Sequence, residues 1–241
     1  MSHSRERLIV ALDVESAAGA RKMVAALDGA VSTYKVGMQL FTAEGPMVVR
    51  DLVSSGKQVF LDLKYHDIPN SVAGAVREAA QLGVSMLTVH SSGGEKMLRA
   101  ASEAARTANP SLLVLAVSVL TSFGDHDLAQ LGVEAGLEDQ VLRLSEMALR
   151  AGCGGVVASA REAFTLRRRL GTSFALVTPG VRPAGAGHQD QARVVTPAEA
   201  VAAGASHIVV GRPITEAKDP VRAAQQILQQ MEDAVVQVSG S

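Results

Sequence analysis

The sequence has almost no cysteine, little net charge and no long apolar run. Cys153 is the only cysteine in 241 residues, which excludes a disulfide within the chain and a metal site built from several cysteines. The net charge of −1 gives no reason to expect a nucleic-acid partner or an anionic membrane surface. Because no run of about eighteen apolar residues is present, we expect no membrane-spanning helix.

The amino-terminal residues also lack a feature, the apolar core of a secretory signal peptide. We therefore expect residues 1–7 to be a flexible N-terminus and the protein to be cytoplasmic. Apolar residues make up 47% of the chain, which is enough for a substantial core. Cys153 lies in an apolar stretch and is expected to be an inert part of that core.

Apolar runs of strand length alternate with alanine-rich segments of helical period along the whole chain. Eight such units within about 240 residues favour a (β/α)₈ barrel over an open, doubly wound sheet, and no break in composition suggests a second domain. We predict one barrel over residues 1–241. The predicted strands are 8–13, 33–38, 58–64, 86–91, 112–120, 154–159, 174–179 and 207–212. The predicted helices are 16–27, 41–54, 71–82, 95–108, 138–151, 161–170, 196–203 and 219–236.

Two opposite charges end the third predicted strand. Because side chains alternate between the faces of a strand, Asp62 and Lys64 should point the same way. Asp67 adds a second carboxylate, and Pro69 marks the start of a helix. One interpretation is an ion pair of purely structural importance, with Asp67 as a helix cap. The other is a lysine that carboxylates keep protonated, ready to deliver a proton.

Polar residues also end the other predicted strands. Catalytic residues of a barrel of this kind lie at the carboxyl ends of its strands, so these side chains should form a ring at one mouth. This agreement favours the functional interpretation of the lysine and its carboxylates. The polar residues at the strand ends are Asp13, Lys35, Asp62, Lys64, His90, Thr121, Ser122 and Arg212.

The last two strand ends have the features of a phosphate site. Barrels often bind phosphate between the loops that follow strands seven and eight. Gly211 would let backbone N–H groups approach an anion, and Arg212 would grip its oxygens with two parallel hydrogen bonds. Residues 180–193 form a long loop rich in glycine and alanine, which is typical either of a lid or of a plain connection.

Several of these motifs together resemble the orotidine 5′-phosphate decarboxylase family, in its shorter bacterial branch. The most specific motif is Asp62-x-Lys64-x-x-Asp67-Ile68-Pro69-Asn70. Small departures fall at Tyr65, Ser71 and Ser91, and none of them changes a charged position. The other matching motifs are Ala11-Leu12-Asp13, Lys35-Val36-Gly37, Val119-Leu120-Thr121-Ser122, Thr178-Pro179-Gly180-Val181-Arg182-Pro183, Asp190-Gln191 and Gly211-Arg212-Pro213-Ile214-Thr215.

The resemblance implies a cofactor-free and metal-free decarboxylase that converts orotidine 5′-phosphate to UMP. It makes Lys64 the donor of a proton to C6 of the pyrimidine, and it implies a homodimer in which Asp67 and Ile68 serve the partner's site. His90 is given only a structural role. The implied catalytic residues are Lys35, Asp62, Lys64 and Asp67. The implied substrate contacts are Asp13 and Lys35 on ribose, Thr121 and Ser122 on the pyrimidine, and Arg182, Gln191, Gly211 and Arg212 on phosphate.

Three alternatives stay open. The 3-keto-L-gulonate 6-phosphate decarboxylases and hexulose-phosphate synthases share the Asp-x-Lys-x-x-Asp pattern but use Mg²⁺, although the Ile68-Pro69-Asn70 continuation favours the orotidylate branch. Lys64 could instead form a Schiff base with a carbonyl substrate. The chain could also be a catalytically silent binder of nucleotide phosphates, because a fold alone does not imply an activity.

Overall fold

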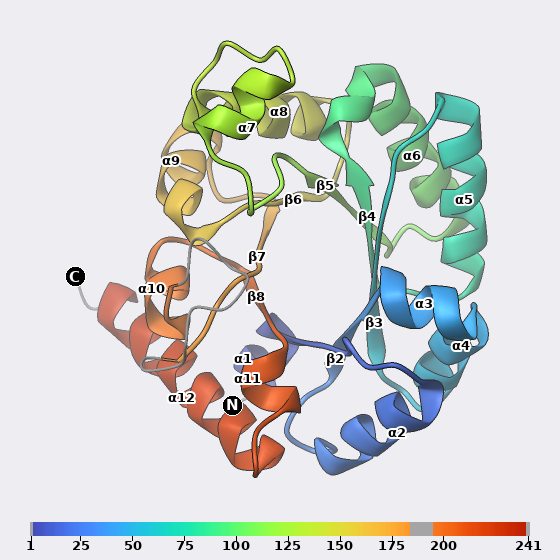
Figure 1. Cartoon of the computed structure of the whole chain (residues 1–241), viewed down its shortest axis with the longest axis vertical. Coiled ribbons are helices and arrows are strands. Elements are labelled where there is room, and N and C mark those ends of the chain that lie inside the picture. Colours follow the sequence, from blue (N-terminus) through green and yellow to red (C-terminus); the bar gives the residue numbers. More distant parts are fainter. Residues whose placement is uncertain (1, 184–194, 240–241) are drawn as a thin grey trace.

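Eight parallel strands close into a single barrel in the computed structural model, which describes residues 2–183 and 195–239 (Figure 1). Each strand pairs with its neighbours in the sequence, and β1 also pairs with β8, so the predicted (β/α)₈ barrel is confirmed. The strands are β1 (Leu8–Ala11), β2 (Thr33–Gly37), β3 (Gln58–Tyr65), β4 (Met86–His90), β5 (Leu113–Val117), β6 (Gly155–Val157), β7 (Ala175–Thr178) and β8 (His207–Val210).

Helices surround the barrel and cover its outer surface (Figure 1). The predicted helix over 41–54 is in fact two helices, because Gly45, with φ 65°, and Pro46 interrupt it. The helices are α1 (Ser2–Arg7), α2 (Ala17–Ala26), α3 (Met38–Glu44), α4 (Met47–Ser54), α5 (Pro69–Gln81), α6 (Gly94–Ala108), α7 (Asp125–Gln130), α8 (Leu137–Arg150), α9 (Ala160–Leu170), α10 (Pro197–Ala202), α11 (Arg212–Thr215) and α12 (Pro220–Ser239), with a 3₁₀ turn η1 at Ser91–Gly93.

Apolar side chains form two separate layers on the two faces of the barrel wall. The larger layer fills the space between the strands and the helices. The smaller one fills the inside of the barrel, where β1, β3, β4, β5, β7 and β8 contribute residues of their inward face. In β3 and after β1, polar residues follow two positions further along: Asp62 comes two residues after Phe60, and Asp13 two residues after Ala11. The inner layer consists of Ile9, Ala11, Phe60, Met86, Leu115, Val177 and Val209.

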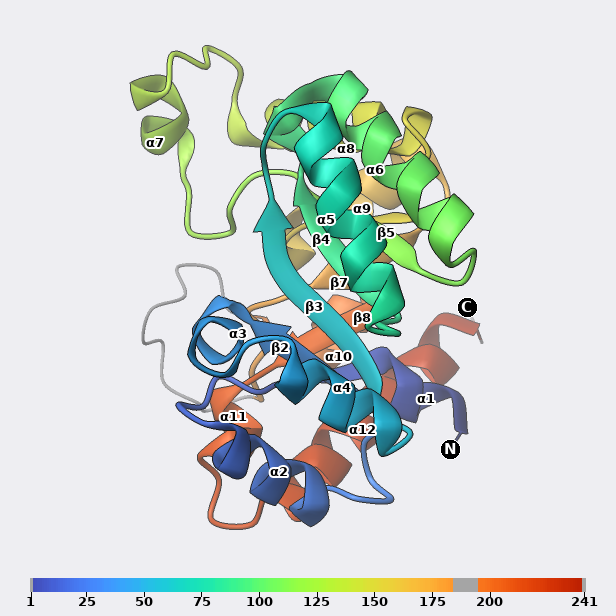
Figure 2. The same cartoon turned by 90° about the vertical axis from the view of Figure 1, so that its right-hand side faces the viewer.

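The two ends of the barrel carry different elements. In Figure 2, α3, α7 and α11 lie on the side where the strands end, and α1 lies on the opposite side. The sequence predicted no element in residues 1–7, but residues 2–7 form α1. Arg7 ties this helix to the start of β8, since its guanidinium donates hydrogen bonds to the carbonyls of Ser206 (2.8 Å) and Ala205 (3.0 Å).

Cys153 is buried, with 6% of its surface exposed. Burial raises the pKa of its thiol to about 11, against a smaller opposite effect of the hydrogen bond from Ser102. The thiol is therefore protonated at neutral pH and is a poor nucleophile, as the prediction of an inert core residue requires. Among the described helices, none has the length and apolarity needed to cross a membrane.

Candidate active site

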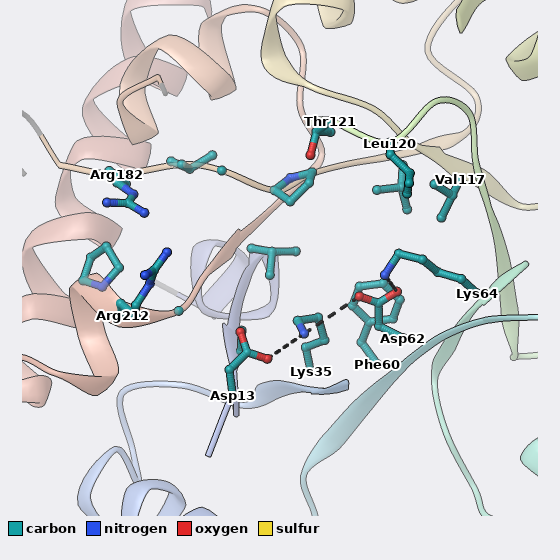
Figure 3. A pocket seen from close by; sticks show the side chains of 18 of the residues that line it. Asp13, Lys35, Phe60, Asp62, Lys64, Val117, Leu120, Thr121, Arg182 and Arg212 are labelled. Carbon is teal, nitrogen blue, oxygen red and sulfur yellow. Dashed lines mark hydrogen bonds and ion pairs between the residues drawn. The ribbon is translucent and has the colours of Figure 1, made fainter. Parts of the chain in front are cut away.

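A cavity of about 280 Å³ opens at the carboxyl ends of the strands (Figure 3). Apolar side chains from the inner layer form its floor, and charged side chains stand around them. This composition, mostly apolar with a few converging polar groups, is typical of a small-molecule site. The lining residues are Ala11, Asp13, Lys35, Phe60, Asp62, Lys64, Val117, Val119, Leu120, Thr121, Val157, Pro179, Gly180, Val181, Arg182, Val209, Gly211, Arg212 and Pro213.

Four charged side chains alternate in sign along one wall of the cavity. Lys64 Nζ lies 2.8 Å from Asp62 Oδ1, and Lys35 Nζ lies 3.8 Å from Asp62 Oδ2. Lys35 Nζ also lies 3.0 Å from Asp13 Oδ1. The side chains of Lys35 and Asp62 are only 12% and 14% exposed, so water screens their attraction less than at an open surface.

The backbone of β3 is irregular where it carries this cluster. Lys64 has φ 51° and is the only non-glycine residue with positive φ in the described part of the chain. Leu61 pairs with Leu87 of β4 but Tyr65 pairs with Val89, so the register shifts between them. Asp62 and Lys64 nevertheless point to one side of the strand, as the alternation of side chains predicted, and their charged groups are in contact.

Two arginines stand at the opposite end of the cavity. Figure 3 shows the guanidinium groups of Arg182 and Arg212 facing the same space, away from Lys64 and Asp62. Arg182 follows β7 and is only 7% exposed, and Arg212 begins α11 directly after β8. The Arg182 N–H donates to the Val195 carbonyl at 2.9 Å, which fixes the backbone there. Two guanidinium groups and the adjacent backbone of Gly211 suit a phosphate.

The charged side chains at the two ends of the cavity therefore come from different halves of the barrel. Asp13, Lys35, Asp62 and Lys64 belong to β1–β3 and the residues that follow β1. Arg182 and Arg212 follow β7 and β8. Between these two ends the cavity wall is largely apolar and uncharged, with Thr121 beside Leu120. A ligand that spans the cavity would meet two arginines at one end and the lysine–aspartate row at the other.

Several residues singled out in the sequence do not reach this cavity. Asp67 and Ile68 are exposed, and the Asp67 carboxylate accepts a hydrogen bond from the Ile68 N–H at 2.6 Å. Ser122 is exposed and is not part of the lining, unlike its neighbour Thr121. Gln191 lies outside the described residues, as does most of the 180–193 loop in which a lid was considered.

His90 lies at the edge of the charged cluster. Its Nδ1 is 2.7 Å from the Ser92 hydroxyl, and its ring stacks on His66 with centroids 5.4 Å apart. Burial lowers the pKa of His90, and the charges of His66 and Lys64 lower it further. The ring is therefore held neutral at physiological pH, next to a cationic lysine.

One buried residue of the site was missed by sequence reasoning. Thr88, in β4, contacts both Asp62 and the backbone of Lys64. The available signal was its position two residues before His90, which puts it on the same face of the strand. Within the residues that the structure describes, no group of three or more histidine, cysteine, aspartate or glutamate side chains is placed to hold a metal ion.

Comparison with known proteins gives one consistent result. Residues 6–227 match the model of the "Orotidine 5'-phosphate decarboxylase / HUMPS family". The chain is 50% identical over 237 residues to an orotidine 5′-phosphate decarboxylase of Syntrophotalea carbinolica, covering 96% of this chain and 97% of the relative. It is 49% identical over 236 residues to that of Moorella thermoacetica, covering 95% and 94%.

A solved structure agrees with these relatives. A crystal structure of orotidine 5′-phosphate decarboxylase from Lactobacillus acidophilus superposes with a TM-score of 0.85 at 38% identity. That match covers 94% of this chain and 99% of the other.

Proposed function

The chain belongs to the orotidine 5′-phosphate decarboxylase / HUMPS family, and from that premise we propose that it decarboxylates orotidine 5′-phosphate to UMP, the final step of de novo pyrimidine synthesis. The observation that carries the proposal is the division of one cavity into two charged ends. An arginine pair at one end suits a phosphate, and the row Asp13–Lys35–Asp62–Lys64 at the other suits a ring that loses a carboxylate.

The substrate fits this cavity in one direction. Its phosphate binds Arg182, Gly211 and Arg212, together with Gln191, which lies outside the described residues. Asp13 and Lys35 then take the ribose hydroxyls. The pyrimidine lies against Thr121, with C6 close to Lys64. Ser122, which the resemblance also places on the pyrimidine, is exposed and does not line the cavity. The charge pattern supports this direction, because the reverse would place the phosphate dianion against Asp62.

The chemistry needs a cation beside C6. When the bond from C6 to the carboxylate breaks, CO₂ leaves and the electron pair stays on C6 in the ring plane, where the carbonyl groups delocalise it poorly. The Lys64 ammonium stabilises this pair and then transfers a proton from Nζ to C6 to give UMP. The resulting neutral lysine regains a proton from solvent. Asp62 and Lys35 fix the ammonium in place before the substrate binds, so little reorganisation is needed during the reaction.

Asp62 has a second effect in this arrangement. Its carboxylate would lie near the departing carboxylate of the substrate, and the two negative charges repel each other only until neutral CO₂ forms. We rank this repulsion below stabilisation by Lys64 and below the positioning that the phosphate contacts provide, since remote binding energy can raise the rate at the reacting centre.

The active unit that we propose is a homodimer in which Asp67 and Ile68 complete the partner's site. Two observations support a shared site. Asp67 does not line the cavity of its own chain, although it follows directly from the strand that carries Lys64. Ile68, the neighbour of Asp67, leaves 67% of its surface exposed, and the proposed partner would cover this apolar side chain.

The test is turnover of purified orotidine 5′-phosphate, followed as loss of its ultraviolet absorbance, with and without EDTA. We expect turnover that EDTA leaves unchanged, because the charges of the site suffice without an ion. Inhibition by EDTA that Mg²⁺ reverses, with activity on 3-keto-L-gulonate 6-phosphate or on hexulose phosphate formation, would assign the chain to the metal-dependent relatives instead. Binding of UMP without any turnover would identify a silent binder.

A further inference from the structure

Thr88 occupies the point where β3 departs from regular pairing. Leu61 and Tyr65 of β3 pair with Leu87 and Val89 of β4, so residues 62–64 lie opposite Thr88 alone. Such an insertion in one strand re-aims the side chains that it carries. Here those side chains include Asp62 and Lys64. Thr88 is 1% exposed and is not part of the cavity lining, so it lies behind the charged pair and not in contact with a ligand.

Only one assignment of donor and acceptor satisfies both hydrogen bonds of the Thr88 hydroxyl. The Lys64 backbone N–H lies 2.9 Å from Thr88 Oγ1, and an amide N–H can only donate. The hydroxyl oxygen is therefore the acceptor there, and its single proton is left for Asp62 Oδ1, at 2.9 Å. The same carboxylate oxygen receives Lys64 Nζ at 2.8 Å. Thr88 thus closes a ring that contains the backbone N–H of Lys64, the Asp62 carboxylate and the Lys64 ammonium.

This closed set of hydrogen bonds explains how the backbone of Lys64 keeps its positive φ. A residue with a Cβ rarely adopts positive φ, and it does so only where the surroundings determine it. The Lys64 N–H finds its partner in a side chain of β4 instead of a β4 carbonyl. Without the hydroxyl, this part-buried N–H would lose its acceptor and Asp62 Oδ1 would lose one of its two donors. Both changes would free the ammonium to move.

We propose that Thr88 is a positioning residue for decarboxylation, which fixes Lys64 Nζ by holding the backbone of Lys64 and the carboxylate of Asp62 at once. The inference rests on the proposed function. It assigns Thr88 no contact with substrate. Its effect is therefore on the chemical step, which depends on placing the reacting groups to within a fraction of an ångström, and not on the phosphate end that supplies binding.

The kinetic test compares three variants with the wild type. Thr88→Val keeps the shape but removes the hydroxyl, and we expect kcat to fall about 10- to 100-fold, the range for a lost hydrogen bond to a charged group, with KM changed less than about 3-fold. Thr88→Ser restores a hydroxyl and should keep kcat within about 3-fold of wild type. Thr33→Val is the matched control: it is the same change in a buried threonine of β2, at the other end of the barrel, and should leave kcat unchanged.

Wild-type kcat in Thr88→Val, or equal losses in Thr88→Val and Thr88→Ser, would overturn the proposal. If Thr88→Val does not fold, Thr88→Cys takes its place, because a thiol of similar size is a weak donor and acceptor. Its kcat should fall clearly below that of Thr88→Ser, and equality of the two would count against the role of Thr88.

A structural readout separates this inference from the proposed function. In crystals of Thr88→Val, or of Thr88→Cys, Lys64 should leave positive φ or its Nζ should move beyond about 4 Å from Asp62, whereas Thr88→Ser should keep both features. An unchanged Lys64 would refute the positioning role. If wild-type protein fails to turn over orotidine 5′-phosphate, the proposed function fails, and these crystal structures still decide whether Thr88 positions Lys64.

Discussion

Asp62 is the residue on which the charged row depends, because each of its two oxygens faces a different lysine. Lys64 Nζ lies 2.8 Å from one oxygen and Lys35 Nζ 3.8 Å from the other. Strand alternation was enough to predict from the sequence that Asp62 and Lys64 share a face, and the short distance between them confirms it. The bulge between them was not predictable in this way, because no glycine marks the residue with positive φ.

The role of Asp67 could not be decided from the sequence around it. The sequence offered two interpretations of it, a helix cap and a carboxylate of the active site. In the structure it accepts a hydrogen bond from the N–H of Ile68, the residue before the first turn of α5, and it does not line the cavity of its own chain. Only the resemblance to a family suggested that it acts across an interface, since no local pattern reports a partner chain.

Replacing Lys64 by alanine tests the proton donor. We expect Lys64→Ala to lower kcat by at least about 10²- to 10⁴-fold, the usual contribution of a positioned acid, while the protein stays folded and still binds UMP. Turnover by absorbance and UMP binding by calorimetry measure the two effects. Lys57→Ala is the matched control, because Lys57 pairs with Asp28 outside the cavity. A purified Lys64→Ala enzyme with substantial activity would remove Lys64 from the mechanism.

Arg212→Ala tests the phosphate end. We expect kcat/KM for orotidine 5′-phosphate to fall by the equivalent of about 2–5 kcal/mol, the loss on truncating one partner of a buried charged contact. The slow reaction of orotidine, which has no phosphate, should hardly change. Arg99→Ala provides the control, since Arg99 forms an exposed pair with Glu95 on α6. Equal losses on both substrates would contradict a phosphate role for Arg212.

At the scale of elements, the sequence predicted all eight strands but not their ends. The fifth strand was predicted over 112–120 and is Leu113–Val117, because Val119 and Leu120 are apolar for another reason: they line the cavity after the strand has ended. α1, α7 and α11 were not predicted, since helices of four to six residues are too short for a helical period to be visible. α10 also has six residues, but Thr196-Pro197 marks its start as a cap followed by proline.

The contact between α1 and the start of β8 leads to a prediction of how the free energy of unfolding depends on pH. Burial lowers the pKa of His207 to about 4, and the nearby charge of Arg7 adds to the effect. The folded protein therefore resists protonating His207, whereas the unfolded chain takes up this proton near its ordinary pKa of about 6.5. The unfolded state binds more protons between these two values. The free energy of unfolding should thus fall as the pH drops from about 6.5 to about 4, by an upper limit on the order of 3 kcal/mol.

Chemical denaturation at pH 7.5 and pH 4.5 measures this effect, in wild-type protein and in His207→Asn. Other groups titrate in the same window, so the informative quantity is the difference between the two proteins. The variant should lose clearly less stability on acidification than the wild type. An identical pH dependence would show that His207 does not set it.

The whole molecule was the most predictable level of the structure. Eight strand–helix units of near-regular length leave few arrangements, and closure follows because β1 and β8 would otherwise be unpaired edges. The site was predictable to the extent that it consists of strand ends. The proposed homodimer was not predictable from residue patterns, since an interface between two copies leaves no periodic pattern in one sequence.

Mixed dimers test the shared site. Each site of the proposed dimer combines Lys64 of one chain with Asp67 of the other, so Lys64→Ala and Asp67→Ala homodimers should both be nearly inactive. In a mixed dimer one site receives both changes and the other receives neither. Random mixing of equal amounts makes about half of the dimers mixed, and about a quarter of wild-type activity should return. Differently tagged chains verify that subunits exchange, and no recovery after verified exchange would exclude a shared site.

The placement of the two charged ends on different halves of the barrel has an evolutionary consequence. The early strands carry the lysines and aspartates of the charged row, and the arginines that follow the late strands stand at the other end of the cavity. In the function that we propose, mutations in the first half can therefore change the reaction while the second half still binds the phosphate of the substrate. Enzymes that act on other phosphorylated compounds can evolve from a gene with this arrangement. The reason is that the residues proposed to bind phosphate and the residues proposed to carry out the reaction can change independently.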